Sequence, residues 1–493
     1  MKASGRIPPA QAEVAAFLAG LAGAAPIETH ISAVFVGRDT AWKMKKAVAL
    51  GFLDFSTLEA RAHFCQRELE LNQPAAPGIY RDVVAITRAP DGQLQEGGDG
   101  AVVEWVLRMA PIPAGDFLDA VAARGALTPE LLDGLGDSLF ALHQAAPLVT
   151  GLDAPAAMAS VLAGNLRAAR AAGLPEAAIT PLATQFQAAL VRSAPLLAGR
   201  AAEGRIRRCH GDLHLGNLCL WQGRPTPFDA LEFDEALARI DTGYDLAFLL
   251  MDLDRQAGRA AANRLLNRYL ARSGDYGVLG LLPFWLALRA LVRAHVEAAR
   301  GRDGVPLLRA AADYLAPPPA RLIAVGGLQG TGKSTLARGL APALGAAPGA
   351  LLLRSDELRK RRFDLAPEEK LPPEAYTEAI SAATHEELFM IAEAALRQGH
   401  AVALDAMFLD AQHRRKAAEI AARIGVPFQG FWLEAPMEIL KSRILARRGD
   451  ASDATIAVLE RAAQSDPGAI EWRRLDAAGD ALGAARQALG AAG

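Results

Sequence analysis

The chain has 493 residues, of which 51% are hydrophobic and 22% are charged, and its formal net charge is −2. This length exceeds what one hydrophobic core usually supports, so two or three domains are expected, and the balanced charge excludes a global attraction to nucleic acid or to an anionic membrane. Only three cysteines occur, without a CxxC pair, which argues against a disulfide framework and indicates a reducing, cytoplasmic setting.

The apolar segments are too short to cross a bilayer. The most hydrophobic one, LGLLPFWLALRALV at residues 279–292, carries Arg289 and falls short of the roughly 20 apolar residues that a transmembrane helix needs. We therefore expect a soluble protein that makes no membrane contact.

The first half of the chain is predicted to contain strands, one helix, further strands and then helices. Residues 31–48 have the pattern of two strands joined at Gly37-Arg38-Asp39, and residues 56–73 switch to helical periodicity. Residues 101–110 predict another strand. From about residue 116 to 205 the apolar residues repeat at helical spacing, which predicts a mainly helical second lobe.

The clearest boundary is APPPARL, residues 316–322, because its three prolines remove backbone donors and favour an extended connection. Downstream, strands and helices alternate, which predicts a parallel sheet with helices on both faces. The expected strands are 321–326, 350–354, 401–405 and 428–433. One expected helix begins at residue 334, and three others cover residues 374–398, 411–424 and 436–447.

The segment HGDLHLGN, residues 210–217, has the spacing of a kinase catalytic loop, H-x-D-x-x-x-x-N. Phosphoryl transfer needs a carboxylate near the acceptor hydroxyl and oxygen ligands that hold magnesium on the phosphates. Asp212 is therefore predicted as the catalytic base and Asn217 as a metal ligand. Asp229 follows a turn at residues 223–225 and is predicted as the main magnesium ligand.

Other polar residues near this segment have less specific predictions. His210 is expected to make structural hydrogen bonds, and His214 either packs or contacts the acceptor. Asp245 precedes an apolar helix and is expected to cap it or to brace a loop. Glu232 and Asp234 either touch a cationic acceptor or, as we expect, are exposed loop charges.

With these motifs in place, residues 27–300 resemble the aminoglycoside phosphotransferase and choline kinase-like superfamily. The resemblance implies a two-lobed α+β fold that binds ATP between the lobes and the acceptor on the helical lobe. It also implies a lysine on a strand that a helix glutamate holds, and Lys43 or Lys45 with Glu68 matches this pair. Strand alternation places both lysines on one face, so both stay candidates for binding ATP. The chain lacks the glycine-rich loop of protein kinases.

The segment GLQGTGKS, residues 327–334, is a complete phosphate-binding loop between an apolar strand and a helix. The loop amides and the helix N-terminus are expected to bind phosphate oxygens, while Lys333 reaches the outer phosphates and Ser334 ligates magnesium. The predicted nucleotide-binding residues are Gly327, Gly330, Thr331, Gly332, Lys333, Ser334 and Thr335.

Acidic and basic residues after this loop predict a kinase. Asp356 follows the second strand and is expected to contact or deprotonate the acceptor, with helix capping as the alternative. Asp405, at the end of the next strand, is predicted to support magnesium. Arg443, Arg447 and Arg448 precede GDASDA and are expected to form a lid over the phosphates.

Residues 320–475 resemble the zeta-toxin, gluconate kinase and polynucleotide kinase group of P-loop kinases. Their one dense basic run, residues 359–362, either grips a phosphorylated acceptor or a nucleic acid end, or lies on a solvated helix face. Nucleic acid is therefore not the expected partner, and it stays an alternative at the C-terminal domain alone.

The whole chain resembles bacterial fusions of these two kinase types. The resemblance implies a kinase-like domain at 1–316, with lobes at about 27–110 and 111–316, and an α/β P-loop kinase domain at 320–493. It also implies ATP and Mg²⁺ as cofactors. The leading hypothesis is two sites that each phosphorylate a hydroxyl of a small, sugar-like or nucleotide-like metabolite, in two consecutive steps. The alternatives are one active kinase with a nucleotide-gated regulator, and a C-terminal polynucleotide kinase or toxin-like module.

Overall fold

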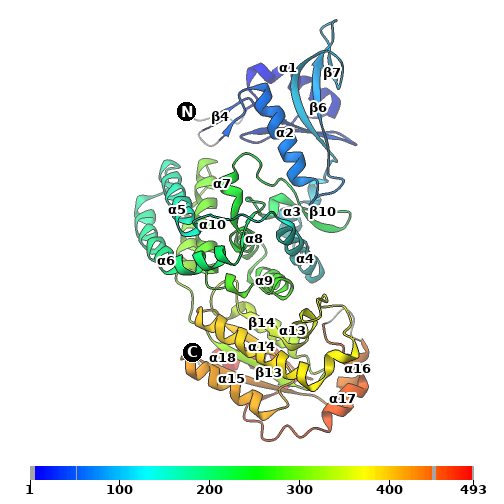
Figure 1. Cartoon of the computed structure of the whole chain (residues 1–493), viewed down its shortest axis with the longest axis vertical. Helices are drawn as coiled ribbons and strands as arrows, with labels where there is room; N and C mark the ends of the chain where they lie inside the picture. The colour runs from blue at the N-terminus through cyan, green and yellow to red at the C-terminus, as the bar shows by residue number, and fades with distance from the viewer. Residues whose placement is uncertain (1–5, 51–52, 447–450, 491–493) are drawn as a thin grey trace. The chain divides into compact units, whose positions relative to one another are not determined.

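The structure is a computed structural model that describes residues 6–50, 53–446 and 451–490. The chain forms two compact units, which are Met1–Gly151 with Gly204–Leu249, and Leu152–Glu203 with Leu250–Gly493 (Figure 1). The helices of the predicted first domain that lie within residues 152–203 and after residue 250 therefore belong to the compact unit that also holds the P-loop sheet. The predicted boundary between residues 316 and 320 stays a prediction.

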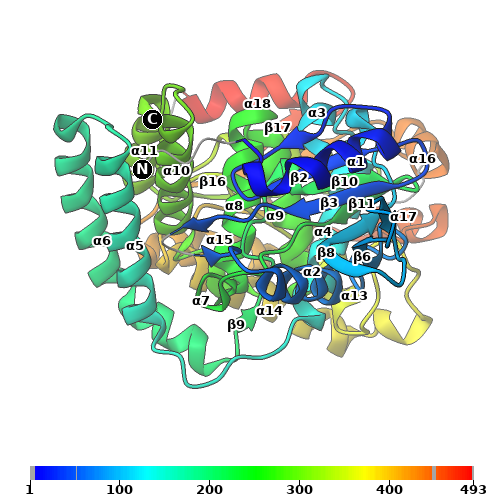
Figure 2. The same cartoon turned by 90° about the horizontal axis from the view of Figure 1, so that it is seen from above.

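The first unit contains an antiparallel sheet of six strands in the order β1-β2-β3-β8-β6-β7. Helices α1 (Ala12–Ala22) and α2 (Leu58–Asn72) cover opposite faces (Figure 2). Alternate residues of one face, among them Phe35, Trp42 and Met44, pack against α1. The strands are β1 (Ile27–Glu28), β2 (Ser32–Val36), β3 (Ala41–Lys45), β6 (Tyr80–Arg88), β7 (Leu94–Glu96) and β8 (Ala101–Met109).

The rest of the first unit carries short strands and helices that frame the HGDLHLGN segment. This segment runs from β9, which pairs with β12, to β10, which forms a hairpin with β11. The strands are β9 (Ile206–Arg208), β10 (Leu218–Trp221), β11 (Arg224–Pro227) and β12 (Arg239–Asp241). The helices are α3 (Leu118–Ala123), α4 (Pro129–Ala145), α7 (Glu235–Ala238) and α8 (Thr242–Gln256), the last of which continues into the second unit.

The second unit combines a helical part with a parallel five-stranded sheet in the order β14-β15-β13-β16-β17. The helices of the first part are α5 (Ala154–Ala171), α6 (Glu176–Ala202), α9 (Arg259–Ser273), α10 (Leu282–Ala299) and α11 (Val305–Leu315). The strands are β13 (Leu322–Gly327), β14 (Leu351–Arg354), β15 (Val402–Asp405), β16 (Phe428–Glu434) and β17 (Arg473–Asp476).

Helices cover both faces of this sheet, as predicted from the alternation of elements. Helices α12 (Lys333–Leu340) and α18 (Ala481–Gly490) share one hydrophobic core with the sheet, and α14 (Glu378–Arg397) and α15 (Ala411–Ile424) contact its strands as well (Figure 1). Helix α13 (Ser355–Arg361) follows the edge strand β14, and helix α16 (Met437–Ala446) follows β16. Helix α17 (Ile456–Ala463) comes after α16 in the chain. In the part of the chain that the structure describes, none of the helices has the length and apolarity that a bilayer crossing requires.

Candidate active sites

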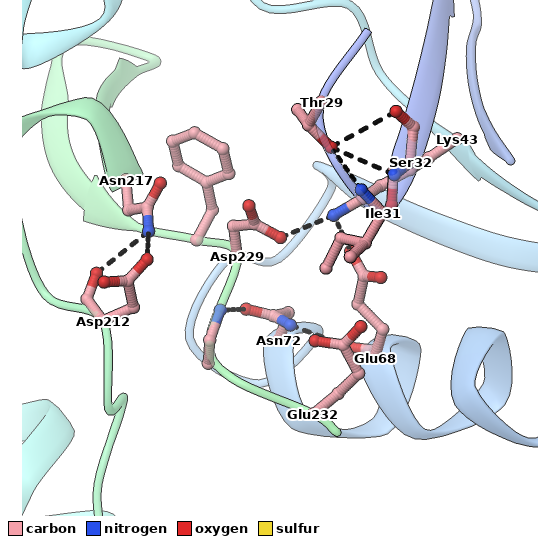
Figure 3. Close-up of polar contacts among 12 residues, drawn as sticks. Thr29, Ile31, Ser32, Lys43, Glu68, Asn72, Asp212, Asn217, Asp229 and Glu232 are labelled. Carbon is pink, nitrogen blue, oxygen red and sulfur yellow. Dashed lines mark hydrogen bonds and ion pairs between the residues drawn. The ribbon is translucent and has the colours of Figure 1, made fainter. Parts of the chain in front are cut away.

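Lys43 and Lys45 both project from β3 toward α2, because the alternate residues Trp42 and Met44 pack against α1. The Nζ atom of Lys43 lies 2.7 Å from Glu68 Oε1 and 2.6 Å from Asp229 Oδ1 (Figure 3). Lys45 Nζ lies 2.8 Å from Glu68 Oε2, and its side chain is 1% exposed. Of the two, Lys43 contacts the predicted metal ligand, so the geometry favours Lys43 as the residue that meets ATP.

These buried groups hold one another in their charged forms. Burial acts to lower the pKa of Lys43, but the carboxylates of Asp229 and Glu68 outweigh it and leave this pKa well above its usual value. Burial acts in the opposite direction on Glu68, yet the ammonium groups of Lys43 and Lys45 hold its pKa at about 2. Removing one partner would leave an uncompensated charge in the interior.

The prediction that Glu232 is an exposed loop charge is wrong. Its side chain is 6% exposed and pairs with Lys45, and burial raises its pKa even though that ammonium group opposes the shift. The loop turns inward because it is tied to α2. Ala230 N donates to Asn72 Oδ1 at 2.8 Å, and Asn72 Nδ2 donates to Glu68 O at 2.9 Å.

The other acidic candidate of this loop, Asp234, caps a helix. Its carboxylate accepts hydrogen bonds from Ala236 N and Leu237 N in the first turn of α7. A helix N-terminus presents such amides, so this contact has a structural explanation.

Side chains from inside and outside the HGDLHLGN loop form hydrogen bonds with the backbone of this loop. Asp245 Oδ2 accepts from His210 N at 3.1 Å, and Asp245 Oδ1 accepts from Gly211 N at 3.0 Å. The His210 ring contacts Phe228 O at 2.8 Å, and burial lowers its pKa. The predicted structural roles of His210 and Asp245 are confirmed. His214 accepts a hydrogen bond from Gly216 N, and its ring lies edge-on to Phe248.

Asp212, Asn217 and Asp229 come together at this loop. Asn217 Nδ2 donates to Asp212 O at 2.9 Å and to Asp212 Oδ2 at 3.1 Å, which directs its amide oxygen away from Asp212 (Figure 3). Asp229 lies between Asn217 and Lys43 in this view. Its φ of 62° is unusual for a residue other than glycine, and its N–H donates to Tyr80 Oη at 2.9 Å.

This arrangement fits the chemistry predicted for it. Amide and carboxylate oxygens are ligands that Mg²⁺ accepts, so Asn217 and Asp229 suit a metal that bridges phosphates. The side chain of Asp212 is 45% exposed, so an acceptor hydroxyl can approach it.

In the second unit, the phosphate-binding loop lines a cavity of about 1130 Å³. The lining includes Lys333, Ser334, Asp356, Asp405 and Arg443. It also includes Gly330, Thr331, Gly332 and Thr335. The structure thus brings the described members of the predicted set into one site, with one exception.

The exception is Gly327, which is not among the described residues that line the cavity. Its φ is 134°, and a Cβ atom at this position would lie 2.5 Å from Leu433 O on the neighbouring strand β16. Glycine at this position allows the end of β13 to pass close to β16. Its predicted contact with the nucleotide stays a prediction.

Ser334 and Asp405, the two predicted metal ligands, are in contact with each other and with Arg354. Ser334 Oγ donates to Asp405 Oδ2 at 2.5 Å. The Nε atom of Arg354 lies 3.1 Å from the same carboxylate oxygen, and its Nη2 lies 3.0 Å from Ser334 Oγ. A hydroxyl and a carboxylate suit Mg²⁺, so Arg354 must share these oxygens with a bound cation or release them. Arg354 was not predicted as a site residue, although it ends a buried strand two residues before Asp356.

Asp356 lies in the first turn of α13 and lines the cavity. Arg354 occupies the N-cap position, so the alternative that Asp356 caps this helix is wrong. Burial raises the pKa of Asp356, and Asp405 adds to the rise while Arg354 opposes it. A carboxylate with a raised pKa is a stronger base, which suits proton abstraction from a hydroxyl.

The basic run 359–362 is not a solvated helix face as a whole, because Arg359 and Lys360 are buried, while its grip on an acceptor or a nucleic acid end stays a prediction. Lys360 is fully buried and donates to Pro367 O, and Arg361 and Arg362 both pair with Glu387. Arg361 and Arg362 meet Glu387 because α13 packs against α14, whereas Lys360 also pairs with Asp453 at 3.2 Å. Arg359 is buried beside Tyr376 and lines the cavity, so it alone of the four borders the site.

Of the predicted lid arginines, the structure describes Arg443. Its Nη2 donates to Ala477 O at 2.8 Å and its Nη1 to Gly330 O at 3.4 Å, which places it beside the phosphate-binding loop. Arg447 and Arg448 lie outside the described residues.

Comparisons with known proteins agree with this geometry. Residues 59–282 match a family model described as "Phosphotransferase enzyme family", and residues 322–465 match one described as "AAA domain". A protein of Mycobacterium tuberculosis, Rv2004c, is 32% identical over 475 residues, with 92% of each chain covered.

Two solved structures each resemble a part of the chain. A choline/ethanolamine kinase family protein from Mesorhizobium loti is 14% identical, with 61% of this chain and 92% of that chain covered and a TM-score of 0.36. A gluconokinase from Sinorhizobium meliloti is 20% identical, with 35% of this chain and 90% of that chain covered and a TM-score of 0.24.

Proposed function

Because the chain belongs to the family of proteins that join a phosphotransferase segment to a P-loop kinase segment, we propose that it is a bifunctional ATP-dependent kinase. The family itself establishes the broader class, a phosphotransferase. The proposal adds two active sites, each of which transfers the γ-phosphoryl group of ATP to a hydroxyl of a small metabolite. Sugar-like molecules are the acceptor class that we expect.

The observation that carries this proposal is that each segment has its own complete set of reactive groups. In the first, Lys43 and Asp229 are in contact and Asn217 is hydrogen-bonded to Asp212. In the second, the lining of one cavity includes Lys333, Ser334, Asp356 and Asp405. Two sets with metal ligands support two kinases better than one kinase with a nucleotide-gated regulator.

In both segments the residues have parallel roles. Asp212 and Asp356 would accept the proton of the acceptor hydroxyl, while Lys43 and Lys333 would orient the phosphates. Magnesium held by Asn217 and Asp229, or by Ser334 and Asp405, would neutralise charge on the phosphates. We expect two consecutive phosphorylations of one metabolite, because fusion of the segments shortens the transfer between them.

Metabolite-extract phosphorylation with labelled ATP tests the proposal. The comparison is between the wild type, Asp212→Ala, Lys333→Ala and the double variant, with a 5′-hydroxyl oligonucleotide as a separate acceptor. Two products that are lost independently support two kinases, and a product that needs both residues supports consecutive steps.

Other outcomes contradict parts of the proposal. If every labelled product survives Asp212→Ala, the role assigned to the first site is wrong. Labelling of the oligonucleotide that Lys333→Ala abolishes would instead assign the second site to nucleic acid ends.

A further inference from the structure

Strand β14 lies at one edge of the parallel sheet in the second unit. On its inner side it pairs with β15, and Leu351 N donates to Ala401 O at 2.9 Å. Alternate peptide groups of a strand point in opposite directions within the sheet, so Ala350 C=O and Leu352 N–H face outward. An edge strand presents such groups as unpaired donors and acceptors unless another element covers them.

Asn267 of helix α9 covers this edge with its side-chain amide. Leu352 N donates to Asn267 Oδ1 at 2.7 Å, and Asn267 Nδ2 donates to Ala350 O at 3.2 Å. One residue of an additional parallel strand would make this same pair of hydrogen bonds. The side chain therefore substitutes for a sixth strand at one position.

A second asparagine supports the first. Asn263, one helical turn earlier and 4% exposed, donates from Nδ2 to Ala350 O at 3.0 Å. Its Oδ1 accepts from Asn267 Nδ2 at 3.1 Å, which orients the Asn267 amide toward the strand. A pair of amides, one buried and one half-buried, that is hydrogen-bonded at each of these atoms favours one arrangement over others.

Further contacts join this part of the helical region to the elements that follow β14. Arg361 of α13 donates to Tyr276 Oη at 2.6 Å and stacks on the Tyr276 ring. Gly280 N donates to Gln398 Oε1 at 2.9 Å, just beyond α14. Arg268 Nη1 lies 2.7 Å from Glu368 Oε1 in the loop after α13.

Strand β14 leads directly into the second candidate active site. Its last residue, Arg354, contacts Ser334 and Asp405, and Asp356 lines the cavity two residues later. A shift of β14 along the sheet edge would move Arg354 and Asp356 relative to the phosphate-binding loop on β13.

We propose that Asn267 is a positioning residue for the second kinase site. It acts through β14, by holding Arg354 and Asp356 in register with Ser334 and Asp405. Helix α9 belongs to the segment that matches the phosphotransferase model, so the first segment supplies a structural part of the P-loop site. This inference rests on the proposed kinase function of the second site.

Amide hydrogen exchange and Mg-ATP binding on the full chain test the proposal with Asn267→Leu. Loss of one hydrogen bond should accelerate exchange at the Leu352 amide by about tenfold. The dissociation constant for Mg-ATP, measured by calorimetry, should rise by about threefold or more, because β14 no longer keeps Asp356, and Asp405 at the end of the paired strand β15, in register with the phosphate-binding loop.

The matched control is Arg268→Gln, which changes the same helix and the same interface but leaves the β14 edge intact. It should leave both readouts at wild-type values. Should Asn267→Leu fail to fold by circular dichroism, Asn267→Asp carries the same prediction for Mg-ATP affinity. It keeps an acceptor for Leu352 N–H and removes the donor to Ala350 O.

The remaining outcomes separate this inference from the function on which it rests. Faster exchange at Leu352 with unchanged Mg-ATP affinity overturns the positioning role, because the contact is then structural only. Unchanged exchange overturns the contact itself. Equal Mg-ATP binding by the wild type and Lys333→Ala contradicts nucleotide binding at the second site, and the exchange measurement still reports on the β14 edge.

Discussion

In the two candidate sites, the carboxylate of a predicted metal ligand is paired with a basic side chain in different ways. In the first unit Lys43 contacts Asp229, whose side chain is 37% exposed. In the second unit Arg354 contacts Asp405, and these side chains are 3% and 6% exposed. A compact ammonium group thus meets a carboxylate near solvent, whereas a planar guanidinium with several donors spans a carboxylate and a hydroxyl in the interior. The basic side chain in each site therefore suits the number of oxygen atoms that it contacts and the burial of those atoms.

Loss of the predicted catalytic carboxylates should give the largest effects and test whether the sites are equivalent. We expect Asp212→Ala to lower the rate of first-site products, and Asp356→Ala that of second-site products, by roughly 10²–10⁴-fold, the usual contribution of a general base. Initial rates with labelled ATP measure both. Substitution of an acid near neither site, Asp313→Ala, is the control, and a variant that slows both products equally would show that the sites are not separate.

Glu68→Ala should destabilise the first unit more than any single change on its surface. Glu68 is fully buried between Lys43 and Lys45, so its removal leaves buried positive charge without a partner. The free energy of unfolding should fall by about 3–5 kcal/mol in urea titrations. Glu70→Ala, on the exposed side of the same helix, is the matched control and should leave the urea midpoint nearly unchanged.

Lys43→Met and Lys45→Met should separate catalysis from stability. Lys43 contacts Asp229, so its loss should slow first-site phosphorylation by about 10²-fold through lost electrostatic stabilisation. Lys45 is fully buried against Glu68 and Glu232, so its loss should mainly lower the urea midpoint. The reverse pattern would make Lys45 the residue that binds ATP.

The stability that Glu68 contributes should depend on pH with a defined sign. Its pKa in the folded state is about 2, below the ordinary value of 4.5, so the folded state favours the ionised form. The contribution is complete above the unfolded pKa and is lost as pH falls from 4.5 toward about 2. The difference in unfolding free energy between wild type and Glu68→Gln should therefore be constant from pH 6 to 8, and should narrow below about pH 4.5. A difference that does not change with pH would contradict this ion-pair network.

Much of the fold was predictable because it depends on local pattern. The strands around Lys43, the helix that carries Glu68 and the alternation after residue 320 follow from periodicities of two and 3.6 residues. Strand β17 and helix α18 were not predicted, because a short strand of mostly charged residues and an alanine-rich segment with two glycines give weak signals. Helix α1 was missed for a similar reason, since its apolar residues surround the helix rather than forming one stripe.

The residues of the two motifs can be read from the sequence alone, since HGDLHLGN and GLQGTGKS depend on spacing along a few residues of chain. The contacts of those residues depend on how the whole chain folds. The tertiary structure distinguished Lys43 from Lys45, buried Glu232, placed Arg354 between Ser334 and Asp405, and brought Asn267 to the edge of β14. These contacts join residues between 20 and 187 positions apart in the chain. Their partners are set by how whole elements pack, which no local pattern records.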